Sequence, residues 1–349
     1  MKRFAFVLLF LLVGAAGAGW WLYGGVDRPY KGYPTDEQFV EIPQGSGSSS
    51  IAKRLADAGV IQDVNSFRLA LWVSRSSRRL QAGEYRFDRP MSARQVVDKI
   101  ARGDVYVRPI TFPEGLTIRQ MAALYESKGL GEARAFIAAA SSGELVRDVD
   151  PAAKDLEGYL FPDTYAMPRR ATAEQLVARM VAGTLKALTP EVIETARGRG
   201  LSVRELVTLA SIVEKETGNK DERTLVAAVY SNRLKIGMGL QCDPTVIYAL
   251  ERAGRYTGNL RRDDLQFDSP YNTYRYAGLP PGPIASPGRA SLEAAASPAD
   301  APYIYFVSKN DGSHAFATTL DEHNRNVQKY QIQYFRDQRR GAGSPPRNR

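Results

Sequence analysis

Residues 202–216 read SVRELVTLASIVEKE. Apolar side chains recur at helical spacing throughout this segment and leave only a narrow polar stripe of Arg204, Thr208 and Lys215. Ser202, followed three residues later by Glu205, forms the capping box that begins many helices. A helix that is apolar over most of its surface packs inside a protein. We therefore expect 202–216 to be a mostly buried helix.

The last turn of this helix carries two carboxyl groups, Glu214 and Glu216, and neither lies on the polar stripe. Burial disfavours the charged form of a carboxyl and raises its pKa, and the helix C-terminus acts in the same direction. A carboxylic acid that stays protonated near neutral pH is suited to general acid catalysis. The alternative is that both glutamates project into solvent at a fraying helix end. Spacing does not choose between the two.

The segments around this helix predict an α+β fold. Upstream, strand and helix patterns alternate as a small βααβ-like module that ends in a third helix. Downstream of it the spacing is mostly helical, and after residue 270 prolines punctuate a loop-rich stretch. A strand at 302–307 reads as buried, with a hairpin partner at 314–317 across the turn Asn310-Asp311-Gly312. The predicted helices are 49–58, 64–74, 92–102, 117–127, 133–140, 175–188, 191–199, 221–235, 244–252 and 321–337.

The N-terminus predicts a membrane anchor. Residues 4–25 are uncharged and apolar, and at about 1.5 Å rise per residue they can cross a bilayer core of roughly 30 Å. Small residues at 15–18 resemble a signal-peptide cleavage site, but Trp20, Trp21 and Tyr23 continue the apolar run and suit a membrane interface. Lys2 and Arg3 precede the segment. The positive-inside rule therefore predicts a single-pass protein of the inner (cytoplasmic) membrane with its bulk outside the cytoplasm.

The net charge of +9, from 47 basic and 38 acidic residues, is concentrated at the ends of the chain. Five arginines against Asp337 give the segment 334–349 a net charge of +4, and Lys2 and Arg3 add +2. The charges of the long region between them are nearly balanced, so we exclude a nucleic-acid partner.

Cys242 is the only cysteine, so an intrachain disulfide is impossible. His314 and His323 lack a tight ligand spacing and predict surface or capping roles, and we expect no metal and no cofactor.

Strings that mix tyrosine with Asn, Asp and Thr surround the helix in sequence. Tyrosine rings can stack on sugar faces while polar groups hold the hydroxyls, although the same strings could simply pack as loops. These strings are 157–165, 240–248 and 271–274, followed by the proline-rich 278–284.

Together these motifs resemble the YceG-like (MltG-type) family of membrane-anchored endolytic murein transglycosylases. The resemblance rests on 209–217 (LASIVEKET), on Gln241 with Asp243-Pro244-Thr245-Val246, and on 271–274 and 278–284. It extends to 112–115, 157–165 and 303–307, in the family's order, so it covers nearly the whole exported chain.

The resemblance implies a domain layout. A LysM-like α+β subdomain would occupy 39–105 and a larger mixed, helix-rich catalytic domain 106–337. We expect residues 1–3 in the cytoplasm, an anchor at 4–25, a linker at 26–38 and a disordered basic tail at 338–349.

The resemblance also implies the chemistry. The second glutamate of the family's Glu-Lys-Glu-Thr string is catalytic, which corresponds to Glu216, with Glu214 in support. Cys242 is a departure, since Thr or Ser is common there. Such enzymes cleave the β-1,4 bond between N-acetylmuramic acid and N-acetylglucosamine and leave 1,6-anhydro ends. Motif position suggests six substrate-binding residues: Gln241, Asp243, Thr245, Tyr248, Asn272 and Tyr274.

The implied partners are peptidoglycan glycan strands, the membrane and peptidoglycan synthases, with cleavage terminating or trimming nascent strands. Two alternatives remain at this point. A non-catalytic peptidoglycan-binding or divisome scaffold would not need a carboxyl on a buried helix. A hydrolase that uses water would need a second carboxylate, such as Asp243 or Asp163, to face Glu216.

Overall fold

The computed structural model describes residues 26–74 and 80–342. This part of the chain is a mixed α+β structure, as the sequence predicts, and its strands form two-stranded sheets. It divides into two units. Unit 1 comprises the described residues up to Arg108 together with Ala166–Arg170, and unit 2 comprises Pro109–Tyr165 and the described residues from Ala171 onward.

The predicted cytoplasmic residues 1–3 and the predicted anchor at 4–25 lie outside the described residues. Within 26–74 and 80–342, every helix is too short or too polar to span a bilayer.

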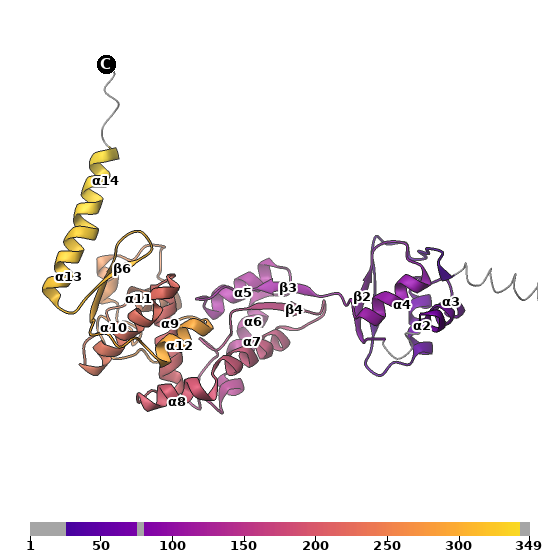
Figure 1. Ribbon diagram of the computed structural model, residues 1–349, viewed down its shortest axis with the longest axis horizontal. Helices are drawn as coiled ribbons and strands as arrows, with labels where there is room; N and C mark the ends of the chain where they lie inside the picture. Colours follow the sequence, from indigo (N-terminus) through magenta and orange to yellow (C-terminus); the bar gives the residue numbers. More distant parts are fainter. Residues whose placement is uncertain (1–25, 75–79, 343–349) are drawn as a thin grey trace, which may run out of the picture. The chain divides into compact units, whose positions relative to one another are not determined.

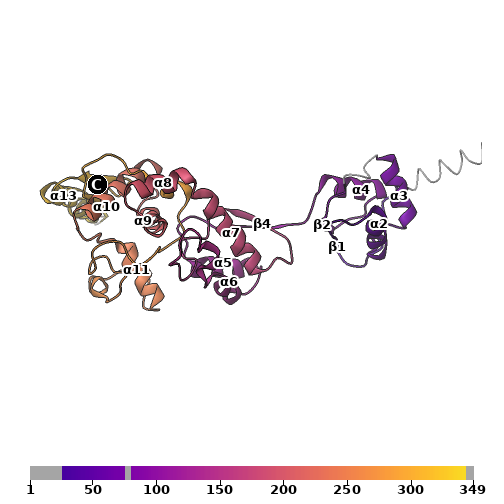
Figure 2. The same ribbon diagram turned by 90° about the horizontal axis from the view of Figure 1, so that it is seen from below.

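Unit 1 is built on an antiparallel pair of strands whose alternate side chains face a core. Val40, Ile42, Tyr85 and Phe87 point into this core, and α2 packs beside the pair (Figure 2). Side-chain caps begin two of its helices: Asp63 caps one, and Ser92 forms a capping box with Gln95. Its elements are β1 (Gln38–Ile42), α2 (Ser48–Asp57), α3 (Val64–Val73), β2 (Gly83–Phe87) and α4 (Ala93–Arg102).

The prediction of a linker at 26–38 is wrong. Val26 is fully buried and Tyr33 is 6% exposed, and both belong to the hydrophobic core of unit 1. The backbone of Tyr30 also forms a β-bridge with Met91. The polar composition of this segment suggested a linker, but its apolar side chains are spaced so that they fill the edge of the core.

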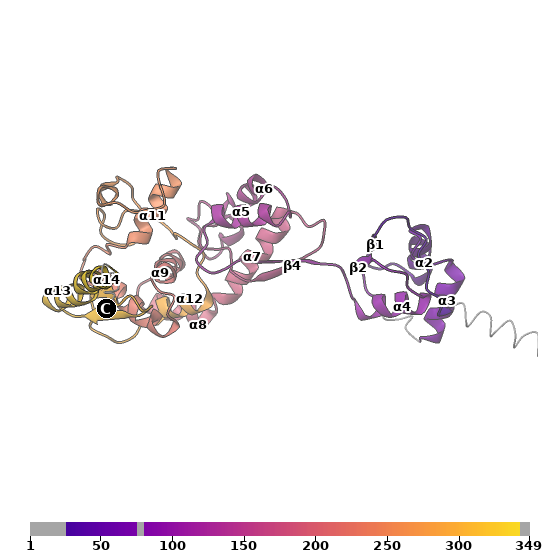
Figure 3. The ribbon, with the colours of Figure 1, turned by 90° about the horizontal axis from the view of Figure 1, so that it is seen from above.

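Unit 2 begins with a helical layer. Helices α5, α6 and α7 pack against one another in sequence order (Figure 3), and Thr117 and Thr172 begin α5 and α7 with capping boxes. The elements of this part are α5 (Ile118–Ser127), α6 (Ala133–Ala140), η1 (Gly143–Val146), α7 (Ala173–Ala187) and α8 (Pro190–Gly198). Strand β3 (Arg108–Thr111) pairs with β4 (Thr164–Met167).

Helix α9 (Val203–Glu216) is the buried helix that the sequence predicts. Side chains from Leu206 to Val213 are all buried, and α10 (Arg223–Lys235) and α12 (Arg289–Ala296) lie beside it (Figure 1). Thr208 is only 1% exposed, so the predicted polar stripe does not continue along the helix. The remaining elements are η2 (Lys220–Glu222), α11 (Asp243–Arg252), η3 (Arg262–Gln266), β5 (Tyr305–Ser308), β6 (His314–Ala317), α13 (Leu320–Val327), η4 (Gln328–Gln333) and α14 (Tyr334–Ala342).

The last third of the chain differs from the prediction in three ways. Helix α12 lies inside the stretch predicted to be loops. Strand β5 does pair with β6, across the predicted turn, but it begins at Tyr305 and is half-buried. Helix α14 continues to Ala342, so the prediction of disorder is wrong for 338–342, and the rest of the predicted tail lies outside the described residues.

Candidate active site

The C-terminal half of α9 is held by loops that are distant in sequence. The backbone N–H of Ile284 donates to Ser211 Oγ at 3.0 Å, and the N–H of Gly288 donates to Glu214 Oε2 at 2.9 Å. Gly158 has a φ of 82° and approaches so closely that a Cβ there would lie 2.4 Å from Pro283. The glycine is therefore required where the loop at 157–165 meets the proline-rich string.

Glu214 is committed to an ion pair inside the protein. Its side chain is 6% exposed, and Oε1 lies 3.3 Å from Nη2 of Arg223, which is itself 7% exposed. The same nitrogen lies 3.3 Å from Glu114 Oε2. The alternative of a solvent-facing Glu214 is therefore wrong, and this carboxylate joins α9 to α10 and to the loop at 112–115.

Glu216, in contrast, has no basic partner in an ion pair within the described residues. It is partly buried, and its Oε1 accepts a hydrogen bond from Cys242 Sγ at 3.0 Å. Burial raises the pKa of Glu216, and the nearby Asp243 carboxylate adds to the increase. Hydrogen bonds from Cys242 and Tyr230, and the charge of His314, act in the opposite direction on this pKa. A raised pKa is what the helix pattern predicts for a general acid.

Cys242 is the donor that fixes this carboxyl. The residue is fully buried directly before α11, and its own N–H donates to Thr273 Oγ1 at 3.0 Å. Burial and the neighbouring Glu216 raise the pKa of the Cys242 thiol. The thiol therefore keeps its proton and donates a hydrogen bond to the carboxylate.

Three of the six predicted substrate-binding residues lie at the surface next to this group. Asp243 is exposed and accepts a hydrogen bond from the Tyr274 hydroxyl at 2.6 Å. Gln241 is exposed and has a φ of 50°, a conformation that few residues other than glycine adopt. The resulting turn directly precedes Cys242, so the exposed Gln241 and Asp243 flank the residue that donates to Glu216.

The other three predicted residues are buried and use their polar atoms within the protein. Thr245 Oγ1 donates to the carbonyl of Cys242 at 2.7 Å, and Asn272 Nδ2 donates to two loop carbonyls. The Tyr248 hydroxyl donates to Glu157 Oε2 at 3.1 Å. Thr245 and Asn272 have no exposed surface and Tyr248 has only 4%, so as folded here they support the loops rather than meet a substrate.

His314 belongs to the site, although the sequence predicts a surface or capping role for it. Its ring is 12% exposed, and Nδ1 lies 2.7 Å from Glu222 Oε2, while its backbone N–H donates to Glu222 Oε1 at 3.0 Å. The ring packs edge-on against Phe306, which in turn contacts Tyr230. His314 is thus connected to the residues around Glu216 and is held by both oxygens of one carboxylate.

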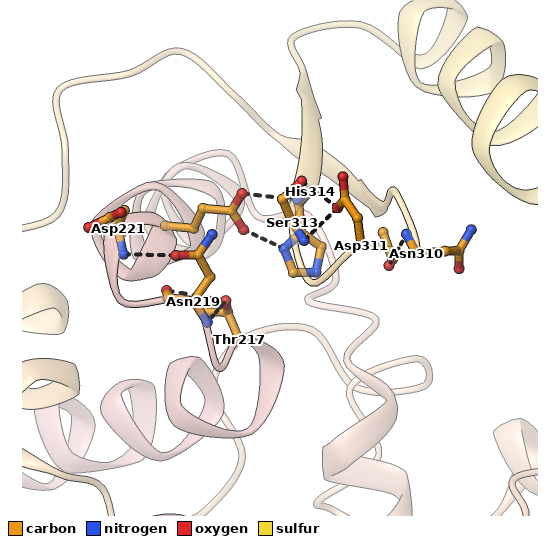
Figure 4. Close-up of polar contacts among 9 residues, drawn as sticks. Thr217, Asn219, Asp221, Asn310, Asp311, Ser313 and His314 are labelled. Carbon is orange, nitrogen blue, oxygen red and sulfur yellow. Dashed lines mark hydrogen bonds and ion pairs between the residues drawn. The ribbon is translucent and has the colours of Figure 1, made fainter.

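Two turns held by polar side chains lie directly next to Glu222 and His314 in sequence, and Figure 4 shows their hydrogen bonds. In one loop the N–H of Asn219 donates to Thr217 Oγ1 at 3.0 Å, and Asn219 Oδ1 accepts from Asp221, next to Glu222. In the hairpin, Asp311 accepts from the N–H of Ser313, next to His314. The Asn-Asp-Gly signal predicts this hairpin. Nothing local in the sequence indicates that Glu222, 92 residues earlier, would meet it.

The sequence of the chain matches a known protein family along most of its length. The YceG-like family model matches residues 40–329. The chain is 35% identical to the endolytic murein transglycosylase of Bacillus subtilis (strain 168), over 83% of this chain and 84% of that protein. It is 31% identical to the endolytic murein transglycosylase of Streptococcus pneumoniae serotype 2 (strain D39 / NCTC 7466), over 87% of this chain and 60% of that longer protein.

A solved structure agrees with the sequence comparisons. The crystal structure of a yceG-like protein from Listeria monocytogenes aligns with a TM-score of 0.56 at 33% identity, over 83% of this chain and 98% of that one. By sequence and by structure, the chain belongs to the YceG-like family.

Proposed function

We propose that this protein is an endolytic peptidoglycan lytic transglycosylase in which Glu216 is the catalytic acid and base. The observation that supports this most is the environment of Glu216: a partly buried carboxyl, with a raised pKa, that accepts a hydrogen bond from a protonated thiol. The residues on either side of that thiol, Gln241 and Asp243, are exposed. Relatives named endolytic murein transglycosylases over most of the chain supply the substrate class.

The mechanism needs a single carboxyl group. Protonated Glu216 donates its proton to the oxygen of the β-1,4 bond between N-acetylmuramic acid and N-acetylglucosamine, and that bond breaks. The resulting carboxylate accepts the proton of the muramic C6 hydroxyl, which attacks C1 and closes a 1,6-anhydro ring. Because the nucleophile is already on the sugar, effective molarity can supply several kcal/mol of rate enhancement, up to about 7–11.

The surroundings of Glu216 support both halves of this cycle. Burial keeps the acid protonated before the bond breaks. The charge of His314 and the hydrogen bonds from Cys242 and Tyr230 favour the carboxylate that forms afterwards. Gln241, Asp243 and Tyr274 are positioned to contact the sugar, and Glu214 maintains the end of the helix.

Hydrolysis is the second candidate, and one observation favours it. The Asp243 carboxylate contributes to the raised pKa of Glu216 and directly follows Cys242, so a second carboxylate lies in the neighbourhood of the acid, where a hydrolase would use it to orient water. Asp163, the other predicted partner, is not among the groups that act on Glu216.

The mass of the products distinguishes these functions. We expect the full chain, incubated with uncrosslinked glycan strands, to release fragments with 1,6-anhydro ends. Hydrolytic ends, one water heavier, would instead support the hydrolase. A non-catalytic scaffold would release no fragments.

Membrane attachment and domain roles form part of the same proposal. We propose that residues 4–25 anchor the protein in the inner membrane with its bulk outside the cytoplasm, where it trims nascent strands beside peptidoglycan synthases. The strand, helix, helix, strand order of unit 1 supports a LysM-like subdomain, and unit 2 carries the catalytic residues.

A further inference from the structure

Two adjoining cavities in unit 2 lie outside the group of residues that surrounds Glu216. Their volumes are about 290 Å³ and 250 Å³, and both linings include Lys154, Asp155, Glu157 and Arg252. Arg252 therefore stands between two spaces, each large enough for a small chemical group. The mechanism proposed above uses neither cavity.

Arg252 is fixed in place without a carboxylate partner. Its Nη1 donates to the Tyr248 hydroxyl at 3.2 Å, and its guanidinium lies 5.7 Å from the Tyr248 ring centroid and 5.4 Å from that of Tyr271. Within the part of the chain that the structure describes, no ion pair includes Arg252. An oriented guanidinium with most of its five donors unused is suited to bind a carboxylate through two parallel hydrogen bonds.

The rest of the lining includes both basic and acidic side chains. Lys154 and Arg119 are exposed in the first cavity, and neither forms an ion pair with any described residue. Asp155 and Glu251 line the same cavity. A peptide that carries carboxylates and a free amine matches such a lining better than a uniformly anionic polymer does.

Helix α11 connects these cavities with the catalytic carboxyl. The helix begins at Asp243, which acts on Glu216, and ends at Arg252. Ten residues at 1.5 Å rise place its two ends about 14 Å apart, and about four extended peptide residues span the same distance. The string 271–274 makes a second connection, because Tyr271 faces Arg252 and Tyr274 binds Asp243.

We infer that the cavities on either side of Arg252 form a subsite for a carboxylate-bearing peptide, such as the stem peptide attached to muramic acid in murein. This inference rests on the proposed function, since it assigns the part of that substrate that lies beyond the sugar. The sugar at Glu216 and the peptide at Arg252 would then be recognised by opposite ends of one helix.

The test compares two substrates that differ only in the peptide: uncrosslinked glycan strands with stem peptides, and the same strands after an amidase has removed them. We expect Arg252→Ala in the full chain to raise KM for the peptide-bearing strands about tenfold or more, as for loss of a charged hydrogen bond, with kcat little changed. For peptide-free strands the variant should equal the wild type. Arg255→Ala is the matched control, because Arg255 is exposed, packs on the Phe267 ring and lines neither cavity.

Several outcomes would overturn the subsite. One is equal kinetics of the wild type on both substrates, and another is no change in KM for Arg252→Ala. If Arg252→Ala loses activity on both substrates, Lys154→Ala decides: a rise in KM confined to peptide-bearing strands supports the subsite, and no rise rejects it. Failure of the wild type to cleave either substrate would contradict the proposed function, which is a different result.

Discussion

At the scale of single residues, two glutamates on the same helical turn have different chemistry because their neighbours differ. Glu214 faces a buried arginine and is held as a charged partner. Glu216 faces a thiol, a phenol and an imidazole, and burial raises its pKa. Of the two carboxyl groups, only Glu216 lies outside an ion pair within the described residues.

The hydrogen bond from Cys242 predicts a shift in the pH dependence of activity. Because this bond lowers the pKa of Glu216, Cys242→Ala should raise that pKa and move the alkaline limb of the kcat/KM profile to higher pH. Cys242→Ser supplies a stronger donor and should move the limb to lower pH. Profiles measured on glycan strands check both directions, and unchanged limbs in both variants would reject the role of Cys242.

Substitution of His314, the partner of Glu222, should slow the reaction. Replacing His314 with Gln removes a charge that favours the Glu216 carboxylate, so kcat should fall by about a hundredfold, as for loss of one stabilising group in an active site. The alkaline limb should also move to higher pH. The control is His323→Gln, since His323 stacks on Tyr305 and does not act on Glu216. A fall in kcat with an unmoved limb would indicate a purely structural role for His314.

The sequence predicts some of these residues better than others, for a physical reason. Helical spacing is local and indicates that Glu214 and Glu216 lie on the buried side of the helix, but only the family motif, which is also local, distinguishes Glu216 from Glu214. His314 and Tyr230 could not, because their approach to Glu216 depends on tertiary contacts between separate elements. Thr245 and Asn272 lie in the correct motif strings, but a motif does not show whether a side chain faces a substrate or the loop behind it.

At the scale of elements, α9 holds the site because several loops are tied to it. Arg223 makes one of these contacts from a buried position, and its guanidinium forms ion pairs with both Glu214 and Glu114. The capping box at Ser202 made the start of α9 predictable from sequence. The predicted start of α7, at 175, is two residues late because the prediction does not use the capping box of Thr172 with Gln175. Helix α12 was missed because it is short, lacks a side-chain cap and lies between prolines.

Loss of this buried ion pair should destabilise the protein. Arg223→Met would leave two carboxylates without their partner, and we expect the free energy of unfolding to fall by about 3–5 kcal/mol. The matched control is Arg147→Met, whose ion pair with Glu144 is exposed and should contribute about 0–1 kcal/mol. Denaturant titration of the three proteins measures both values. Equal stabilities would show that the pair is not needed to hold α9.

At the scale of the whole molecule, a buried carboxyl links stability to pH. Burial raises the pKa of Glu157 to about 7 from its ordinary 4.5, so the folded state binds the proton more tightly than the unfolded state. The stability that this proton contributes is complete below about pH 4.5 and is lost as the pH rises to about 7, for a total of roughly 3 kcal/mol.

Substitution of Glu157 should remove this dependence. Glu157→Gln resembles the protonated form and still offers an acceptor to the Ile118 N–H. We therefore expect the variant to lack the decline in the free energy of unfolding between about pH 4.5 and 7 that this group contributes in the wild type. Denaturation across this range checks the sign, and an unchanged slope would show that Glu157 is not the group responsible.

The central claim is that Glu216 alone is the acid and base of a lytic transglycosylase. The most direct measurement is mass spectrometry of the fragments that the wild type, Glu216→Gln and Glu214→Gln release from uncrosslinked glycan strands. We predict 1,6-anhydro ends from the wild type, none from a folded Glu216→Gln protein, and the same ends, from a less stable protein, with Glu214→Gln. Fragments released by Glu216→Gln, or ends that contain the additional water, would contradict this account.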